Sequence, residues 1–235
     1  MNFLVRISHS FLRSLEACPY QLVLRIRGTT GSNFNSEIHK INTILGHSIH
    51  AAIEDYIDSW RLNNDAVPNV DNLSNHAREI IDEIWDNAPT RIFELVHNIP
   101  IDEERNYRNE QTSKVFNNIV KFCRIWQDRG FQNMNYVSHE EFYSHDYDEG
   151  IELCGAIDLV LLDDDGFYYV LDWKTGSASR ESLGRSQLGI YSFLAREEFS
   201  ISIEQIRCGF ISFKDYSSEI KQFTERDLRV LGKRL

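Results

Sequence analysis

Two short stretches decide the fold: Gly155-Ala156-Ile157-Asp158, and Asp172-Trp173-Lys174-Thr175-Gly176. Each lies in an apolar run, at residues 151–162 and 166–174, and these runs predict two strands. The sequence DDDG at residues 163–166 separates the runs and predicts a tight turn. We therefore expect a β-hairpin that carries both stretches.

The spacing within the second stretch predicts where its side chains point. Asp172 and Lys174 are two residues apart on one strand, so both face one side of the sheet and Trp173 faces the other. Pairing with the preceding strand brings Asp158 close to them. Two neighbouring carboxylates repel each other unless a cation lies between them. For an isolated D-x-K, the simpler interpretation is a surface ion pair.

A divalent cation would resolve that repulsion. Mg²⁺ takes carboxylates, waters and phosphate oxygens as ligands, and the backbone carbonyl of Trp173 is placed to be a further one. Lys174 beside the ion would lower the pKa of a bound water or stabilise a developing negative charge.

Upstream, residues 43–60 predict a helix on which Gly46, His50 and Glu54 are four apart and share a face. A histidine from this helix would complete a metal site that otherwise has only carboxylates. The competing interpretation of a lone helical histidine is an ordinary hydrogen-bonded residue of the core or surface.

Downstream, residues 181–198 predict a helix that carries Gln187 and Tyr191 one turn apart. Both side chains would contact a phosphate or order a metal-bound water. Alternatively, Gln187 is ordinary helix surface and Tyr191 packs in the core.

The rest of the chain predicts helices first and strands later. Ser8 or Ser10 begins a helix that continues to Ile26, and further helices are expected over residues 71–85 and 104–129. Further strands are expected over 135–144, 206–213 and 219–223, and Thr224 with Asp227 resembles a capping box for a terminal helix. We expect one α/β domain over residues 1–235. Within it, residues 1–129 are expected to be mainly helical, and residues 130–235 to form a core with a mixed central sheet flanked by helices.

Composition excludes several classes of protein. With 42% hydrophobic residues in 235, the chain is not intrinsically disordered. No apolar run reaches the ~20 residues of a membrane helix, and the start lacks a signal peptide, so we expect a soluble cytoplasmic protein with no membrane partner. The net charge of −11 argues against a nucleic-acid partner, yet residues 171–235 hold 11 Lys/Arg and 9 Asp/Glu. A polyanion would have to meet this C-terminal segment or one face of the N-terminal helices.

The motifs together resemble a known family. In this order, G-x-x-x-H-x-x-x-E, G-x-x-D, D-x-K-T-G and Q-x-x-x-Y look like the RecB-type branch of the PD-(D/E)XK nuclease superfamily. The early Ser8-His9-Ser10-Phe11-Leu12 and Cys18-Pro19-Tyr20 also resemble the opening of that branch, so the resemblance spans Ser8 to about Leu228. It implies a restriction-endonuclease-like core.

The resemblance also implies roles for individual residues. His50, Asp158, Asp172 and the Trp173 carbonyl would bind Mg²⁺ or Mn²⁺, and Lys174 would be catalytic together with the two carboxylates. Gln187 and Tyr191 would be an accessory pair in the active site. Glu54 would support His50. Glu140 would be a further acid near the site, and the sequence leaves open to which side of the strand its side chain points.

The cysteines mark one departure from the family. Many relatives hold an iron–sulfur cluster with one cysteine near the N-terminus and three clustered near the C-terminus. Here Cys18 matches the first, but only Cys208 lies in the last third; Cys123 and Cys154 lie elsewhere, and there is no CxxC pair. Because such a cluster needs about four ligands, we expect no iron–sulfur cluster, and buried thiols instead.

The resulting hypothesis is a Mg²⁺- or Mn²⁺-dependent deoxyribonuclease that acts in repair, recombination or defence. We expect the site in a cleft between helices and sheet, which favours an exonuclease on single-stranded DNA ends. The chain has no phosphate-binding G-x-x-x-x-G-K-[ST] loop, so unwinding would need a separate helicase or recombination partner. The alternatives are a non-catalytic DNA-binding or scaffold subunit with the same fold, and a carboxylate-metal hydrolase of another substrate.

Overall fold

The computed structural model describes residues 5–12, 40–63, 67–175 and 182–232. The chain divides into two compact units, one of residues 1–30 and 134–235 and one of residues 31–133. We call the first the sheet unit and the second the helical unit. The expected boundary at residue 129/130 lies close to this division. Whether the two units fold as one domain stays a prediction.

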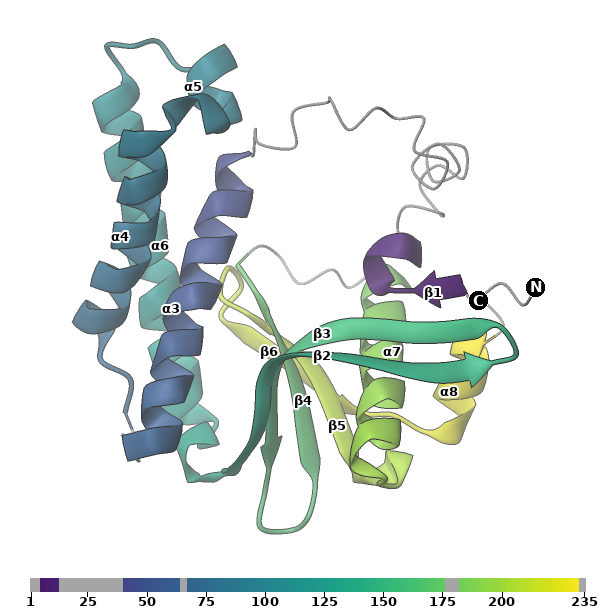
Figure 1. The fold of residues 1–235 in the computed structure, drawn as a ribbon. Helices are drawn as coiled ribbons and strands as arrows, with labels where there is room; N and C mark the ends of the chain where they lie inside the picture. The colour runs from purple at the N-terminus through teal and green to yellow at the C-terminus, as the bar shows by residue number, and fades with distance from the viewer. Residues whose placement is uncertain (1–4, 13–39, 64–66, 176–181, 233–235) are drawn as a thin grey trace. The chain divides into compact units, whose positions relative to one another are not determined.

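A mixed six-stranded sheet forms the centre of the sheet unit (Figure 1). Its strands are β1 (Val5–Ile7), β2 (Asn135–Asp148), β3 (Ile151–Leu162), β4 (Tyr168–Lys174), β5 (Ile206–Ser212) and β6 (Ser217–Gln222). The order is β1-β3-β4-β5-β6, and β2 also pairs with β3. The pairs β1/β3 and β4/β5 are parallel and the others antiparallel. The expected α/β class with a mixed central sheet flanked by helices is confirmed.

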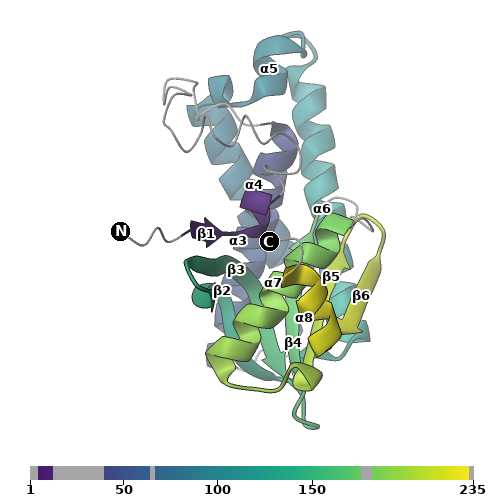
Figure 2. The same ribbon diagram turned by 90° about the vertical axis from the view of Figure 1, so that its right-hand side faces the viewer.

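The helices of the sheet unit are α7 (Ser182–Phe199) and α8 (Glu225–Gly232), with a 3-10 turn at Ile203–Gln205. Helix α7 connects the parallel strands β4 and β5 and lies along one face of the sheet (Figure 2). The expected capping box starts α8: Thr224 N–H donates to Asp227, and Asp227 N–H donates to the Thr224 hydroxyl. The core between α7 and the sheet includes Ile190, Phe193 and Leu194 from the helix. A fully buried side chain of this kind contributes about 1.5–3 kcal/mol.

The N-terminus corrects one expectation. The sequence predicts only helix there, but Val5–Ile7 forms strand β1, parallel to β3 with Ile7 opposite Leu153. Ser8 then begins a helical turn, because its hydroxyl accepts a hydrogen bond from Phe11 N–H. The rest of this expected helix, including Cys18 and Pro19, lies outside the described residues.

The helical unit consists of α3 (Ile41–Asn63), α4 (Val70–Asn87), the short α5 (Phe93–His97) and α6 (Glu104–Asp128), with 3-10 turns at Pro89–Arg91 and Phe131–Asn133. Trp126 is fully buried at its centre. Tyr56 and Trp60 of α3 contact it edge-on with ring centroids 5.5 and 5.2 Å away. The three long helices match the sequence-based prediction.

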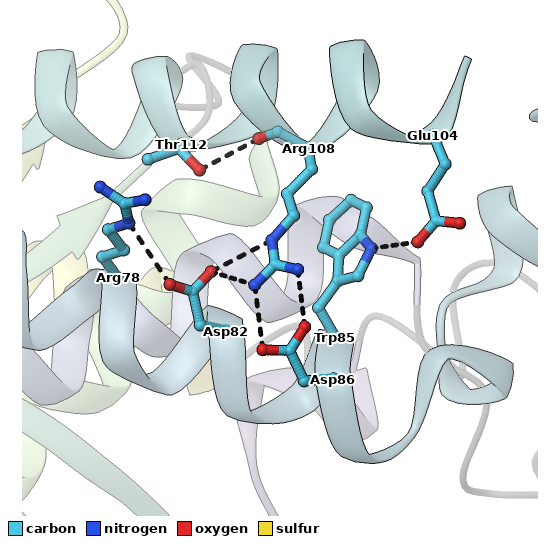
Figure 3. A network of polar contacts seen from close by, with 7 residues as sticks. All are labelled: Arg78, Asp82, Trp85, Asp86, Glu104, Arg108 and Thr112. Carbon is cyan, nitrogen blue, oxygen red and sulfur yellow. Dashed lines mark hydrogen bonds and ion pairs between the residues drawn. The ribbon is translucent and has the colours of Figure 1, made fainter. Parts of the chain in front are cut away.

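A polar network joins α4 to α6 (Figure 3). The guanidinium of Arg108 on α6 donates to Asp82 and to Asp86 on α4, with shortest distances of 2.6 Å to each. It also lies over the ring of Trp85, 5.7 Å from the centroid, and the Trp85 indole N–H donates to Glu104. Hydrogen bonding to Arg108 holds the pKa of Asp86 below its usual value.

Candidate active site

Strand β4 presents Asp172 and Lys174 on the face that α7 covers. Lys174 forms an ion pair with Oδ2 of Asp172. Trp173 alternates to the other face, where its ring stacks on Phe213 with centroids 6.1 Å apart. Asp172 is 3% exposed, whereas the Lys174 side chain is 32% exposed. The Lys174 side chain therefore reaches solvent, while the carboxylate that it neutralises is buried.

Asp158 lies beside this pair, as the hairpin predicts. The last paired residues of β3 and β4 are Leu159 and Leu171, so the next step of the register places Asp158 opposite Asp172. The backbone N–H of Trp173 donates to Oδ2 of Asp158 over 2.7 Å. Asp158 is 8% exposed, and the two carboxylates thus share one largely buried region of the sheet.

Glu140 is a third acid at this place. The pairs His139–Leu159 and Glu141–Ile157 flank it in the β2/β3 ladder, which puts Glu140 opposite Asp158. Carboxylate oxygens of Glu140 and Asp158 lie within 4.8 Å of each other. Glu140 has φ +47°, a left-handed conformation that costs energy for a residue with a side chain. The direction of the Glu140 side chain could not be predicted from the sequence, because no sequence pattern indicates a left-handed residue inside a strand.

Helix α7 holds Asp172 from the other side. Gln187 donates from Nε2 to Oδ1 of Asp172 over 2.8 Å and to the Tyr191 hydroxyl over 2.9 Å. The Tyr191 hydroxyl in turn donates to Oδ1 of Asp172 over 3.5 Å. Both helix residues are 7% exposed. Burial, and next the charge of Asp172, raise the pKa of Tyr191, so its hydroxyl stays a neutral donor.

Gly155 explains the first position of the G-x-x-D motif. A Cβ atom built on Gly155 would lie 3.1 Å from Cε1 of Tyr191, tighter than ordinary van der Waals contact. Gly155 therefore lets the Tyr191 ring lie close against β3, three residues before Asp158. The motifs G-x-x-D, D-x-K and Q-x-x-x-Y thus meet in one site of the sheet unit.

Comparison with known proteins agrees with this geometry. The model of the PD-(D/E)XK nuclease superfamily matches residues 6–230 of the chain. The chain belongs to this superfamily. Among solved structures it is similar to one titled "Crystal structure of SSO0001", with 11% sequence identity, coverage of 93% of this chain and 85% of that chain, and a TM-score of 0.28. No curated protein matches the chain.

Membership of the PD-(D/E)XK superfamily implies a metal-dependent nuclease, and the donor chemistry of the site fits a hard divalent cation. Carboxylate oxygens of Glu140 and Asp158 lie within 4.8 Å of each other, Asp172 lies opposite Asp158 on the neighbouring strand, and Lys174 pairs with Asp172. Carboxylate oxygens are the ligands that Mg²⁺ and Mn²⁺ prefer. An added cation would offset the remaining repulsion between the acids.

The other predicted site residues belong to the helical unit. His50 lies on α3, where it is partly buried, and Glu54 lies one turn further on and is exposed. A role for either residue at a metal stays a prediction. On β4 of the sheet unit, a role of the Trp173 carbonyl as a metal ligand likewise stays a prediction.

The described cysteines are buried thiols. Cys123 lies on α6, Cys154 on β3 and Cys208 on β5. Burial raises the pKa of all three, to about 11 for Cys123. Cys18 lies outside the described residues, and the absence of an iron–sulfur cluster stays a prediction. Within the described ranges, no helix has the length and apolar character needed to cross a membrane.

Proposed function

We propose that this chain is a Mg²⁺- or Mn²⁺-dependent deoxyribonuclease of the RecB-type branch. The observation that carries the proposal is the meeting of Asp158, Asp172 and Lys174 on one face of the sheet, with Gln187 bound to Asp172. Retention of the whole set argues against the alternative of a non-catalytic scaffold, which would not need a lysine and two acids in this arrangement.

Asp158 and Asp172 would hold the metal, with Glu140 as a neighbouring acid. By resemblance, His50 and the Trp173 carbonyl would complete the ligand set, and Glu54 would orient His50. The ion supplies Lewis-acid chemistry: it polarises a phosphate and lowers the pKa of a water. The left-handed backbone of Glu140 supports a functional assignment, because strained residues cluster at active sites.

Lys174 is the group suited to stabilise charge on the phosphate. Its ammonium is the accessible member of the pair with Asp172, so an incoming phosphate oxygen can reach it. Negative charge that builds up on the phosphate during water attack would strengthen this contact, and a contact that strengthens in the transition state accelerates the reaction. Gln187 and Tyr191 would keep Asp172 in one orientation through their hydrogen bonds.

We propose single-stranded DNA ends as the substrate. The C-terminal third carries the excess of basic residues, among them Lys214 and Lys221 on or near β6, while the rest of the chain is strongly acidic. A flexible single strand can follow a short basic path, whereas a stiff duplex would meet more of the acidic surface. Arg180, another residue of this basic set, lies outside the described residues. A separate helicase would supply single strands where the substrate is a duplex.

The test is a cleavage assay with purified protein on end-labelled DNA. We expect hydrolysis with Mg²⁺ or Mn²⁺, none with EDTA, and a rate that falls as salt rises. Linear single strands should be cut and covalently closed circles of the same sequence should not. Equal cutting of both would show an endonuclease, and DNA binding without cutting under all metal conditions would favour the scaffold alternative.

A further inference from the structure

A groove lies next to the candidate site, between α7, the end of β6 and α8. It has a volume of about 240 Å³. Its apolar lining comes from Gly189, Phe223, Val230 and Leu231, and its polar lining from Ser186, Lys221, Gln222 and Asp227. We call it the α7–α8 groove. Ser186 directly precedes Gln187, so one turn of α7 borders both the groove and the site.

The sheet connects Lys174 to this groove along the same face. Lys174 lies over the ring of Phe210 on β5, 5.1 Å from its centroid. Phe210 is paired with Glu219 on β6. Cys208, two residues before Phe210 on β5, is paired with Lys221. Directly paired residues share a face, so Lys221 lies on the same face as Lys174.

The register also gives the separation. Lys174 pairs with Ser212 and Val170 with Cys208, so Lys221 is four residues along the sheet and two strands across from Lys174. At usual strand dimensions this is about 13 Å along and about 10 Å across, or roughly 16 Å in all. The buried Phe210 and Cys208 occupy the direct line along this face, so a polynucleotide bound at Lys174 would reach Lys221 over the surface of the sheet unit, a few nucleotides away.

Lys221 is the basic side chain among the described residues that line the groove, and it is the group that would contact a phosphate at the rim. Lys221 is about half exposed and pairs with Glu219, a surface contact that an incoming phosphate can replace at little cost. Asp227 is engaged by the N–H and hydroxyl of Thr224 in the capping box. The floor of the groove is apolar and favours an uncharged, flat group over a phosphate. Leu231 and Phe223 are buried there, whereas Val230 is 48% exposed and open to a ligand.

We propose that the α7–α8 groove binds one nucleobase of the DNA strand held at Lys174, with Lys221 contacting an adjacent phosphate. The volume suits a single flat heterocycle, since pockets for drug-sized ligands usually start at about 300 Å³. An apolar floor accepts the faces of any base, so the groove would position the strand without reading its sequence. This inference rests on the proposed function, because it assigns a portion of the same substrate.

The experiment measures binding of a fluorescent single-stranded oligonucleotide by anisotropy, in wild-type protein with EDTA, so that Lys174 is present and the strand stays intact. One abasic site is moved along the oligonucleotide, one position at a time. We expect one position, or two adjacent ones, at which loss of the base weakens binding about 5- to 10-fold. Adding Val230→Glu should weaken binding of the intact oligonucleotide by a similar factor and remove the dependence on position. Lys221→Glu should weaken binding and reduce its salt dependence.

Val96→Glu is the matched control, because Val96 on α5 is 47% exposed and lies outside the groove. It should leave binding unchanged. Equal affinity at every abasic position, or an effect of Val230→Glu no larger than that of Val96→Glu, would overturn the proposal. Wild-type hydrolysis of the p-nitrophenyl ester of thymidine monophosphate tests the proposed function separately, since that substrate has no neighbouring nucleotides. If the ester is hydrolysed but affinity does not depend on the position of the abasic site, the groove proposal alone is rejected. If neither the ester nor end-labelled DNA is cleaved, the nuclease proposal is rejected.

Discussion

The backbone N–H of Trp173 donates a 2.7 Å hydrogen bond to Oδ2 of Asp158. This bond fixes the carboxylate on β3 against the strand that carries Asp172 and Lys174. Asp158 therefore has two functions to separate, one as an acceptor within the fold and one as a negative charge in the site.

Two substitutions of Asp158 separate those functions. Asp158→Asn keeps an acceptor for the Trp173 N–H, so its free energy of unfolding should stay close to wild type. Asp158→Ala leaves that buried N–H without its acceptor and should lower the free energy of unfolding by about 1–3 kcal/mol. Urea denaturation followed by circular dichroism measures both. Equal stability of the two variants would show that the hydrogen bond contributes little to the fold.

Gly209 should be intolerant of any side chain. A Cβ atom there would lie 2.5 Å from the backbone oxygen of Glu219 and 2.7 Å from Cα of Ile220, so β6 would have to move. We expect Gly209→Ala to lower the free energy of unfolding by about 1–3 kcal/mol. Gly189→Ala is the control, because the three atoms nearest to its Cβ would all belong to the flexible Leu231 side chain, the closest at 3.4 Å, and alanine favours a helix by up to ~1 kcal/mol. A Gly209→Ala protein as stable as Gly189→Ala would contradict the close β5–β6 approach.

Arg108 should contribute more to the helical unit than other surface arginines. Arg108→Met removes its bonds to Asp82 and Asp86, and we expect a loss of about 1 kcal/mol, since the network is partly exposed to solvent. Arg78→Met is the control: Arg78 also pairs with Asp82 but is 62% exposed, so its loss should be smaller.

The same network gives a pH dependence. Arg108 lowers the pKa of Asp86 from its usual value of 3.8, so the stabilisation is present above pH 3.8 and is lost as the pH falls through the lowered pKa. The deficit of Arg108→Met should therefore shrink in strongly acidic solution. Urea titrations at neutral pH and below pH 3.8 measure it. A deficit that grows on acidification would contradict the assignment.

The described thiols should react slowly. Cys123, Cys154 and Cys208 are buried, and burial raises the pKa of each, so little thiolate is available near pH 8. In a Cys18→Ser protein, a thiol reagent such as DTNB should modify less than one cysteine quickly in the native state and three after denaturation. Rapid modification of the folded protein would show that one of these thiols is exposed.

The sequence predicted much of the sheet unit because its signals are local. Alternation of residues places Asp172 and Lys174 on one face, and helical spacing places Gln187 and Tyr191 together. The structure brings all four together with Asp158. Each of these relationships depends on periodicity within one element or on a short hairpin.

Other features were missed because they depend on distant pairing. Strand β1 has only three residues and is defined by its pairing with β3, about 146 positions away, which no local pattern encodes. Glu140 faces Asp158 through the register of two long strands and a left-handed backbone. The short helix α5 has too few residues to show a helical period.

The central claim is that Asp172 and Lys174 form a hydrolytic site, and the most direct test is the rate of DNA cleavage by single variants. With Mg²⁺ or Mn²⁺, Asp172→Ala and Lys174→Ala should each lose about 100-fold or more, because each removes charge that acts on the transition state. Lys114→Ala, which removes a lysine of α6 that pairs with Glu110, is the control for loss of one positive charge. Circular dichroism should show an unchanged fold for all three. Cleavage by Lys174→Ala protein at the wild-type rate would contradict the account.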